Sequence, residues 1–250
     1  MHSFSKYHGT GNDFILVDDR AKTASLSEDQ IKALCHRRFG VGGDGVILLA
    51  PSAIGDYRMR IFNSDGKEAE MCGNGLRCLV QFLCDLGEAK ETFLIETQKR
   101  VYPCAVADGA ISVDMGIPQL VKEEGGDFFI KVGVPHCVTF TDDLSRFDLE
   151  ARNKFSKLHV NINYAMISPL QTIQMRTFER GVEEETFSCG SGGTAVCMAA
   201  WKRFGLSGPV TVQFGSGEAL KYDVQVKGGE VTTIMMTGAA THVFSGELPS

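Results

Sequence analysis

The sequence predicts an α/β protein built from two similar domains that face each other across a cleft. Three observations lead to this class. Most of the chain consists of short strand patterns separated by polar or glycine turns, helical patterns are few, and one unit of sequence occurs twice. With 250 residues, 43% of them hydrophobic and 22% charged, the chain has ordinary globular composition and is long enough for one large or two small domains.

Strands are expected where apolar or alternating runs are bounded by polar or glycine residues. Such runs lie at 14–18, 46–50, 58–62, 93–97, 101–107 and 110–115. A helix is expected over about residues 27–38, with Ser27 as its N-cap. Two further apolar helices follow Cys-Gly motifs and end at Gly87 and Gly205.

The repeat is carried by order, spacing and residue identity. Met59-Arg-Ile-Phe62, an acidic turn and Cys72-Gly-Asn-Gly75 recur as Met175-Arg-Thr-Phe178, an acidic turn and Cys189-Gly-Ser-Gly192. Residues 108–116 also resemble 228–236, and strands ending at 18–19 and 142–143 both finish in Asp-Asp. Two copies of one unit predict domains at 1–116 and 117–240, with a C-terminal tail, 241–250, that packs with the first.

Charge and hydropathy exclude some classes of partner. The formal charge is −6 and there is no basic run, which argues against nucleic acid. Residues 1–14 contain no long apolar stretch of a secretory signal, and no apolar run approaches the roughly 20 residues of a membrane helix. We therefore expect a soluble cytoplasmic protein that binds neither nucleic acid nor membrane.

The eight cysteines include no Cys-x-x-Cys pair, and the six histidines are scattered, so no metal site is predicted. Without a secretory signal the thiols are expected to be reduced. Five of them are interpreted as small buried hydrophobic residues: Cys35, Cys78, Cys84, Cys104 and Cys197.

Cys72 and Cys189 have a different context, because each begins a Cys-Gly-x-Gly motif between a strand and a helix. The glycines let the backbone turn sharply and expose its amides. A helix N-terminus carries unpaired N–H groups and a partial positive charge, so it binds a carboxylate and favours a cysteine thiolate.

Two such cysteines, related by a repeat, indicate two-base chemistry. If both helix ends hold one substrate carboxylate, its α-carbon lies between the two sulfurs. One thiolate then removes the α-proton and the opposite thiol supplies another, which inverts the stereocentre. Helix-end amides stabilise the planar carbanion. This scheme requires no metal and no pyridoxal cofactor.

Several motifs occur together in one order along the chain: 9–14 (Gly-Thr-Gly-Asn-Asp-Phe), 62–66 (Phe-Asn-Ser-Asp-Gly), 71–75 with Arg77-Cys78, Pro135-His136, 179–181 (Glu-Arg-Gly) and 186–192. In this set the chain closely resembles the diaminopimelate epimerase family over nearly its whole length. The resemblance implies cofactor-independent conversion of LL- to meso-2,6-diaminopimelate, a step toward lysine and peptidoglycan precursors, with Cys72 and Cys189 as acid and base. It also implies a homodimer, and in each domain a curved, mostly antiparallel sheet wrapped around a central helix.

The resemblance assigns further roles position by position. Asn12, Asn63, Asn161, Glu179 and Arg180 match substrate contacts, with Arg180 and the asparagines on the distal carboxylate and amine. Amides of Gly73, Asn74, Gly190 and Ser191 match the groups that hold the reacting carboxylate. His136 and Glu179 match residues that poise the thiols. The alternatives are a hydrogen-bonded core histidine at 136 and a solvated turn pair at 179–180.

Three departures from the family pattern bear on specificity. Gly45 stands where the family usually has Gln, Val134 stands where it has Asn, and the loop 181–186 is one residue longer and lacks a second glycine. Two lost polar contacts weaken selection for diaminopimelate. Our hypothesis is that the enzyme also accepts other amino acids, such as glutamate.

Competing interpretations are less well supported. Gly40-Val-Gly-Gly-Asp-Gly45 matches a dinucleotide fingerprint, but it follows a helix and precedes a strand, so it is interpreted as a helix-ending turn. Cys72 and Arg77 are one residue too close for a phosphatase loop, and a cysteine hydrolase gives no reason for a second motif. A proline-racemase-like racemase and a non-catalytic amino-acid-binding protein stay open.

Overall fold

The computed structural model describes residues 3–248, which divide into two compact units. Unit 1 holds the described residues up to Val113 and those from Gly238 onward, and unit 2 is Asp114–Thr237. Residues 249 and 250 of the predicted C-terminal tail lie outside the described residues. Within 3–248, no helix is both long and apolar enough to cross a membrane.

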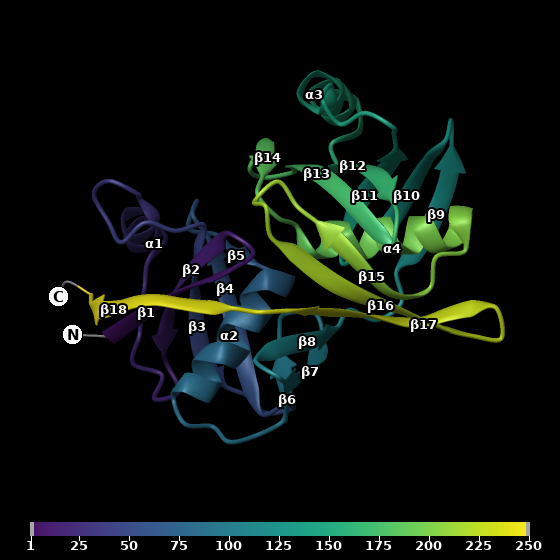
Figure 1. The fold of residues 1–250 in the computed structure, drawn as a ribbon. Coiled ribbons are helices and arrows are strands. Elements are labelled where there is room, and N and C mark those ends of the chain that lie inside the picture. The colour runs from purple at the N-terminus through teal and green to yellow at the C-terminus, as the bar shows by residue number, and fades with distance from the viewer. Residues whose placement is uncertain (1–2, 249–250) are drawn as a thin grey trace. The chain divides into compact units, whose positions relative to one another are not determined.

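Unit 1 contains one sheet in the order β18-β1-β2-β3-β4-β6-β7-β8 (Figure 1). Neighbours are antiparallel except for β2–β3 and β4–β6, and a short β5 pairs with β4. The elements are β1 (Ser3–Gly9), β2 (Asn12–Asp18), α1 (Glu28–Cys35), β3 (Gly45–Pro51), β4 (Tyr57–Asn63), β5 (Glu68–Ala69), α2 (Gly73–Asp85), β6 (Thr92–Glu96), β7 (Val101–Ala107), β8 (Ala110–Asp114) and β18 (Thr241–Glu247).

Unit 2 contains one sheet in the order β9-β10-β11-β12-β13-β15-β16-β17. Here β11–β12 and β13–β15 are parallel, and β14 pairs with β13. The elements are β9 (Gln119–Glu124), β10 (Asp127–Val132), β11 (Val134–Phe140), α3 (Phe147–Leu158), β12 (Asn161–Ser168), β13 (Thr172–Glu179), β14 (Glu184–Thr186), α4 (Gly190–Phe204), β15 (Gly208–Gln213), β16 (Ala219–Lys227) and β17 (Glu230–Gly238).

The two sheets have the same succession of antiparallel and parallel pairs, with β18 of unit 1 in the place of β9 of unit 2. Each unit also has a helix between its first parallel pair and a second helix after its short strand. The predicted fold class, two pseudo-symmetric and mostly antiparallel α/β domains, is therefore confirmed. The strand order shows that the repeat found in the sequence is a repeat of topology.

The second helix of each unit is enclosed by its sheet. Ten residues of α2 between Gly73 and Leu83 are buried, and so are ten residues of α4 between Gly190 and Ala200. In unit 1, strands β1 to β4 surround α2 (Figure 1). A helix that is apolar on most sides is stable only when it is covered in this way, which explains the small and apolar residues of both helices.

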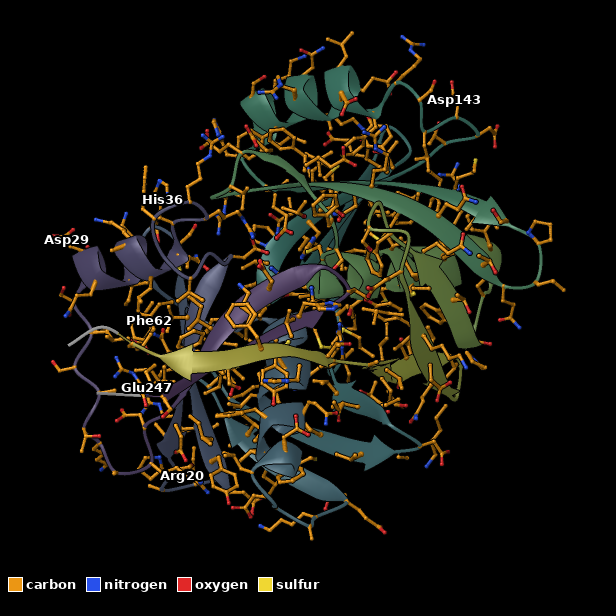
Figure 2. The ribbon with its side chains drawn as sticks, turned by 60° about the vertical axis from the view of Figure 1, so that its left-hand side comes forward. Arg20, Asp29, His36, Phe62, Asp143 and Glu247 are labelled. Atoms are coloured by element: carbon orange, nitrogen blue, oxygen red, sulfur yellow. The ribbon has the colours of Figure 1, made fainter. Side chains whose placement is uncertain are left out.

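The helix α1 begins as predicted and ends early. Ser27 is its N-cap and forms a capping box with Gln30. The predicted end at residue 38 is wrong, because the helix ends at Cys35 and His36 leaves the helical conformation. Its side chain accepts the backbone N–H groups of Arg38 and Phe39, which turns the chain toward Gly40. Figure 2 shows Asp29 on the helix and His36 just beyond it.

The bounds of the six strands predicted from the sequence agree with the structure to within two residues. The six predicted strands correspond to β2, β3, β4, β6, β7 and β8, and the glycines at 40–45 link α1 to β3. Gly205 adopts the left-handed conformation that ends α4, and Gly87 has a φ of 92° beyond α2. Helix α3 was not predicted, although Phe147, Ala151 and Phe155 recur at helical spacing and pack into one core cluster.

Candidate active site

Cys72 is the N-cap of α2, and its sulfur accepts the backbone N–H of Gly75 at 3.5 Å. The first turn of the helix carries no acidic residue, so no carboxylate within that turn offsets the positive end of the helix dipole. Gly75 packs closely on β3 and β4, since a Cβ there would lie 3.1 Å from Ile47 and from Ile61. The strand-to-helix junction thus places the thiol beside helix-end amides.

Asn12 is the residue of β2 that reaches Cys72. Its Oδ1 lies 3.6 Å from the sulfur and accepts the side-chain N–H of Asn74 at 3.3 Å. Its Nδ2 donates to the Asp44 carboxylate at 2.6 Å. A carboxylate only accepts hydrogen bonds, so the end of the Asn12 amide that contacts Asp44 is the nitrogen. The end that faces the Cys72 thiol is therefore the oxygen. The structure therefore brings the predicted residues Asn12, Gly73 and Asn74 together with Cys72.

A charged cluster behind Asn12 holds it in place. Arg37 binds the Asp13 carboxylate through both terminal nitrogens, at 3.0 and 2.7 Å, and reaches Asp44 at 2.8 Å. The buried Lys6 contacts Asp13 at 2.7 Å. Burial raises the pKa of the Asp13 carboxyl, but Arg37 and Lys6 outweigh it and lower that pKa to about 2. Sequence reasoning missed this cluster because its members lie apart in the chain.

Asn63 ends β4 opposite Gly45 of β3. The N–H of the next residue, Ser64, donates to the Asp44 carbonyl at 3.1 Å. The backbone N–H of Asn63 donates to Lys67 and its carbonyl accepts from Gly66, so Asn63 opens a tight turn with an exposed side chain. Gly66 has a φ of 87°, and a Cβ there would lie 2.7 Å from the Glu28 carbonyl oxygen. The turn therefore requires glycine and holds Asn63 at the surface.

Cys189 is the N-cap of α4 and repeats the arrangement. Its sulfur accepts the backbone N–H of Gly192 at 3.3 Å. Gly193 packs against Tyr222, where a Cβ would lie 2.3 Å from the hydroxyl oxygen, and that hydroxyl donates to the Gly190 carbonyl at 3.0 Å. The glycines of this motif are thus needed for packing as well as for the turn.

His136 lies next to this half-site. It is 1% exposed, and its Nε2 lies 3.1 Å from the hydroxyl of Ser191, which in turn lies 3.5 Å from the Cys189 sulfur. Its Nδ1 lies 3.2 Å from Nδ2 of Asn163. Burial lowers the pKa of His136 to about 3, so the imidazole is neutral near pH 7. The buried, hydrogen-bonded His136 is thus linked to Cys189 through Ser191.

The remaining predicted residues lie at the ends of β12 and β13. The buried Asn161 accepts the backbone N–H of Arg180 through its Oδ1 at 2.8 Å. The Glu179 carboxylate accepts the hydroxyl proton of Thr186. Arg180 is exposed, directly after β13. Asn161 thereby fixes the start of the loop that carries Arg180.

Asn163 is a site residue that sequence reasoning missed. It is fully buried on β12, two residues beyond Asn161, and contacts His136. Residues two apart on a strand lie on the same face of the sheet. Two asparagines at this spacing in an otherwise apolar strand were a usable signal, because buried polar side chains need partners.

Solved structures of low sequence identity share this fold. A Bacillus anthracis phenazine biosynthesis protein of the PhzF family matches with a TM-score of 0.78 at 17% identity, over 100% of this chain and 99% of that one. A hydroxyproline epimerase from Agrobacterium vitis matches with a TM-score of 0.70 at 13% identity, over 99% and 90%. The fold is therefore one that epimerases and phenazine biosynthesis proteins share.

Closer relatives define the family within this fold. The family model described as diaminopimelate epimerase matches residues 4–121 and 128–243. The diaminopimelate epimerase of Synechocystis sp. is 39% identical, over 98% of both chains, and that of Archaeoglobus fulgidus is also 39% identical, over 98% of this chain and 96% of that one. The chain belongs to the diaminopimelate epimerase family and is an isomerase.

Proposed function

We propose that this enzyme interconverts LL- and meso-2,6-diaminopimelate by two-base proton transfer, with Cys72 and Cys189 as the bases. The observation that carries the proposal is the pair of N-cap thiols on the central helices α2 and α4. Each sulfur accepts an N–H from the fourth residue of its Cys-Gly-x-Gly motif, in units of the same strand order. Family membership supplies the substrate, and the repeated thiol supplies the mechanism.

In this mechanism both half-sites act on one α-carbon. One thiolate removes the α-proton while the opposite thiol donates a proton to the other face, so each turnover inverts the centre and exchanges the roles of the two sulfurs. The first amides of a helix have no acceptor within it, and those of Gly73, Asn74, Gly190 and Ser191 are proposed to stabilise the substrate carboxylate and the carbanion. The reaction needs no cofactor.

Asn12, Asn63, Asn161, Glu179 and Arg180 are proposed to recognise the substrate. Arg180 supports this role because it is exposed at the end of β13, where a guanidinium can bind a carboxylate through two nitrogens. Glu179 carries a carboxylate that suits a substrate ammonium group. The distal end of diaminopimelate has both charges, whereas proline has no distal end.

Substrate range is proposed to extend beyond diaminopimelate, to amino acids such as glutamate. Gly45 has no side chain, and a Cβ there would lie 2.3 Å from the Phe62 carbonyl oxygen, so the position cannot hold the family's usual glutamine without movement. The side chain of Val134, half-buried on β11, has no group that can form a hydrogen bond. Assay of a panel of L-amino acids for α-proton exchange in D2O tests this point, and exchange restricted to diaminopimelate contradicts it.

The decisive experiment measures solvent deuterium in LL-diaminopimelate after incubation with reduced wild type, Cys72→Ala and Cys189→Ala. Exchange with inversion in the wild type and loss of inversion in both variants is the expected result. Inversion retained in either variant contradicts the two-base mechanism. If another amino acid exchanges its α-proton and diaminopimelate does not, the mechanism holds and the substrate is that amino acid. If no amino acid exchanges, the protein is a binding protein.

A homodimer in the cytoplasm is part of the same proposal. It is supported by the family resemblance of the sequence. Light scattering coupled to size-exclusion chromatography tests the dimer, for which a chain of 27.2 kDa is expected to elute at twice that mass.

A further inference from the structure

Five side chains of unit 2 form a continuous line of hydrogen-bonding contacts that ends at Cys189. Thr177 on β13 lies 3.1 Å from Oδ1 of Asn163 on β12, and Nδ2 of Asn163 lies 3.2 Å from Nδ1 of His136 on β11. Nε2 of His136 lies 3.1 Å from the hydroxyl of Ser191, which lies 3.5 Å from the Cys189 sulfur. Three strands thus contribute to the surroundings of one thiol.

The orientation of Asn163 is set by its other partners. Its Nδ2 also lies 3.1 Å from the backbone carbonyl oxygen of Cys137 and 3.4 Å from that of Asn161, and a carbonyl oxygen only accepts hydrogen bonds. This end of the amide is therefore the nitrogen. The opposite end is the oxygen, which accepts the Thr177 hydroxyl proton. Nδ2 has two protons, which go to its two shorter contacts, the Cys137 carbonyl and Nδ1 of His136, because an amide nitrogen cannot accept a proton from Nδ1.

The orientation of Asn163 determines which ring nitrogen of His136 carries the proton. Burial lowers the pKa of His136 to about 3, and the positive charge of Arg180 acts in the same direction, so the neutral ring has one proton. Nδ1 accepts from Asn163, which leaves that proton on Nε2. The Nε2–H group therefore donates to the Ser191 oxygen.

We propose that Asn163 is a positioning residue that fixes the tautomer of His136 and thereby makes the Ser191 hydroxyl a hydrogen-bond donor to Cys189. The serine oxygen already accepts from His136, and a Cys189 thiolate can only accept, so the single serine proton points to the sulfur. With the Gly192 amide, the Cys189 thiolate then has two donors. Hydrogen bonds to a charged form favour that form. The line transfers no proton, and its catalytic consequence rests on the proposed two-base function.

Unit 1 provides an internal comparison. At the helix position of Ser191, α2 has Asn74, whose side chain donates to Asn12 and has no hydroxyl group. The oxygen of Asn12 in turn lies 3.6 Å from the Cys72 sulfur. Changes to Ser191 or Asn163 are therefore expected to act on Cys189 and to leave the ionisation of Cys72 unchanged.

The tautomer is measured directly by NMR of enzyme labelled with 15N-histidine, with the signal of His136 identified by its loss in His136→Gln. The expected spectrum shows a protonated Nε2 and an unprotonated Nδ1 at every pH from about 5 to 8, as burial of the neutral ring requires. A proton on Nδ1, or on both nitrogens, would overturn the proposal.

The effect on the thiol is measured by alkylation with iodoacetamide as a function of pH, with Cys189 and Cys72 quantified separately by peptide mass spectrometry. Ser191→Ala is expected to raise the Cys189 midpoint by about one pH unit, the scale of one hydrogen bond to a charged group. Ser191→Thr should restore it. Thr194→Val is the control, since it removes a buried hydroxyl that donates to the Gly190 carbonyl.

Asn163→Leu is expected to raise the same midpoint and to add no further shift to Ser191→Ala, because both variants interrupt one line of contacts. Ser191 is half-buried, so Ser191→Ala remains informative even where Asn163→Leu does not fold. An unchanged Cys189 midpoint in Ser191→Ala, or equal shifts at both cysteines, would overturn the proposal. Neither readout needs turnover, so failure of the proposed reaction appears separately, as absent deuterium exchange in the wild type.

Discussion

The side-chain oxygen of Asn163 lies 2.5 Å from the point that a Cβ on Gly192 would occupy. Asn163 belongs to β12 and Gly192 to α4. Their close approach packs the row of hydrogen-bonded side chains that includes Asn163 and His136 against the first turn of α4. Gly192 also donates its N–H to the Cys189 sulfur. Gly192 therefore satisfies two requirements. It leaves room for the Asn163 side chain, and its N–H caps the helix by donating to the Cys189 sulfur.

Gly192→Ala is expected to displace Asn163 and to destabilise the protein by about 1–3 kcal/mol, the usual cost of overpacking a core. Urea unfolding measures the stability, and the Cys189 alkylation midpoint should rise as in Asn163→Leu. Gly75→Ala in α2 is the matched control, because the atoms nearest its Cβ would be the flexible ends of two isoleucine side chains, at 3.1 Å, followed by the Cβ of Cys72 at 3.4 Å. Equal losses of stability in Gly192→Ala and Gly75→Ala would contradict the conclusion that Asn163 requires glycine at position 192.

Arg77→Lys is expected to destabilise unit 1, since the Arg77 side chain is fully buried on α2. Its terminal nitrogens bind Asn74 and Thr10, each at 3.0 Å, and Thr10 has a φ of 57° in the turn before Asn12. Lysine keeps the charge but has one nitrogen in place of the two terminal nitrogens of the guanidinium. The free energy of unfolding is expected to fall by about 1.5–3 kcal/mol for each lost hydrogen bond, as measured by thermal or urea unfolding. Activity should fall as well, because the turn positions Asn12.

The exposed Arg38 offers the control for Arg77→Lys, as Arg38→Lys should leave both stability and activity unchanged. Equal stability of Arg77→Lys and wild type would show that the buried Arg77 guanidinium does not hold the turn at Thr10.

Asp13 is expected to contribute stability that is lost in acid. Its carboxyl has a pKa of about 2 in the folded protein, below the ordinary aspartate value of 3.8, so the folded state favours the ionised form. The contribution is present above about pH 4 and disappears as the pH falls through about 2. The difference in free energy of unfolding between wild type and Asp13→Asn should therefore shrink from pH 5 to pH 2. A difference independent of pH would contradict the assignment.

Restoring the family's usual residues at two positions should have opposite outcomes. Gly45→Gln is expected to destabilise by about 1–3 kcal/mol, because its Cβ would lie 2.3 Å from the Phe62 carbonyl oxygen. Val134→Asn should fold normally, since Val134 is half-buried, and should raise the preference for diaminopimelate over glutamate. Unfolding curves and competition assays of deuterium exchange test both. A stable Gly45→Gln variant would show that β3 and β4 can separate locally.

Local signals predicted the strands and the helix starts with good accuracy. Ser27 begins α1, and Cys72 and Cys189 begin α2 and α4, because a capping side chain acts on amides only two or three residues away. The end of α1 was missed because His36 stops the helix with side-chain hydrogen bonds that no helix-ending glycine or proline marks. Helix α3 was missed although its apolar spacing is regular.

The sequence alone determined the fold class, the repeat and the two thiols at helix ends, since all three depend on residue spacing and on short-range backbone geometry. Only the tertiary structure decided which groups surround each thiol. Asn12 faces Cys72 with an oxygen, whereas Ser191 faces Cys189 with a hydroxyl that His136 and Asn163 orient. These contacts depend on which strands lie side by side and in which register. A hydrogen bond is directional, so its effect on a thiol depends on which atom points at the sulfur.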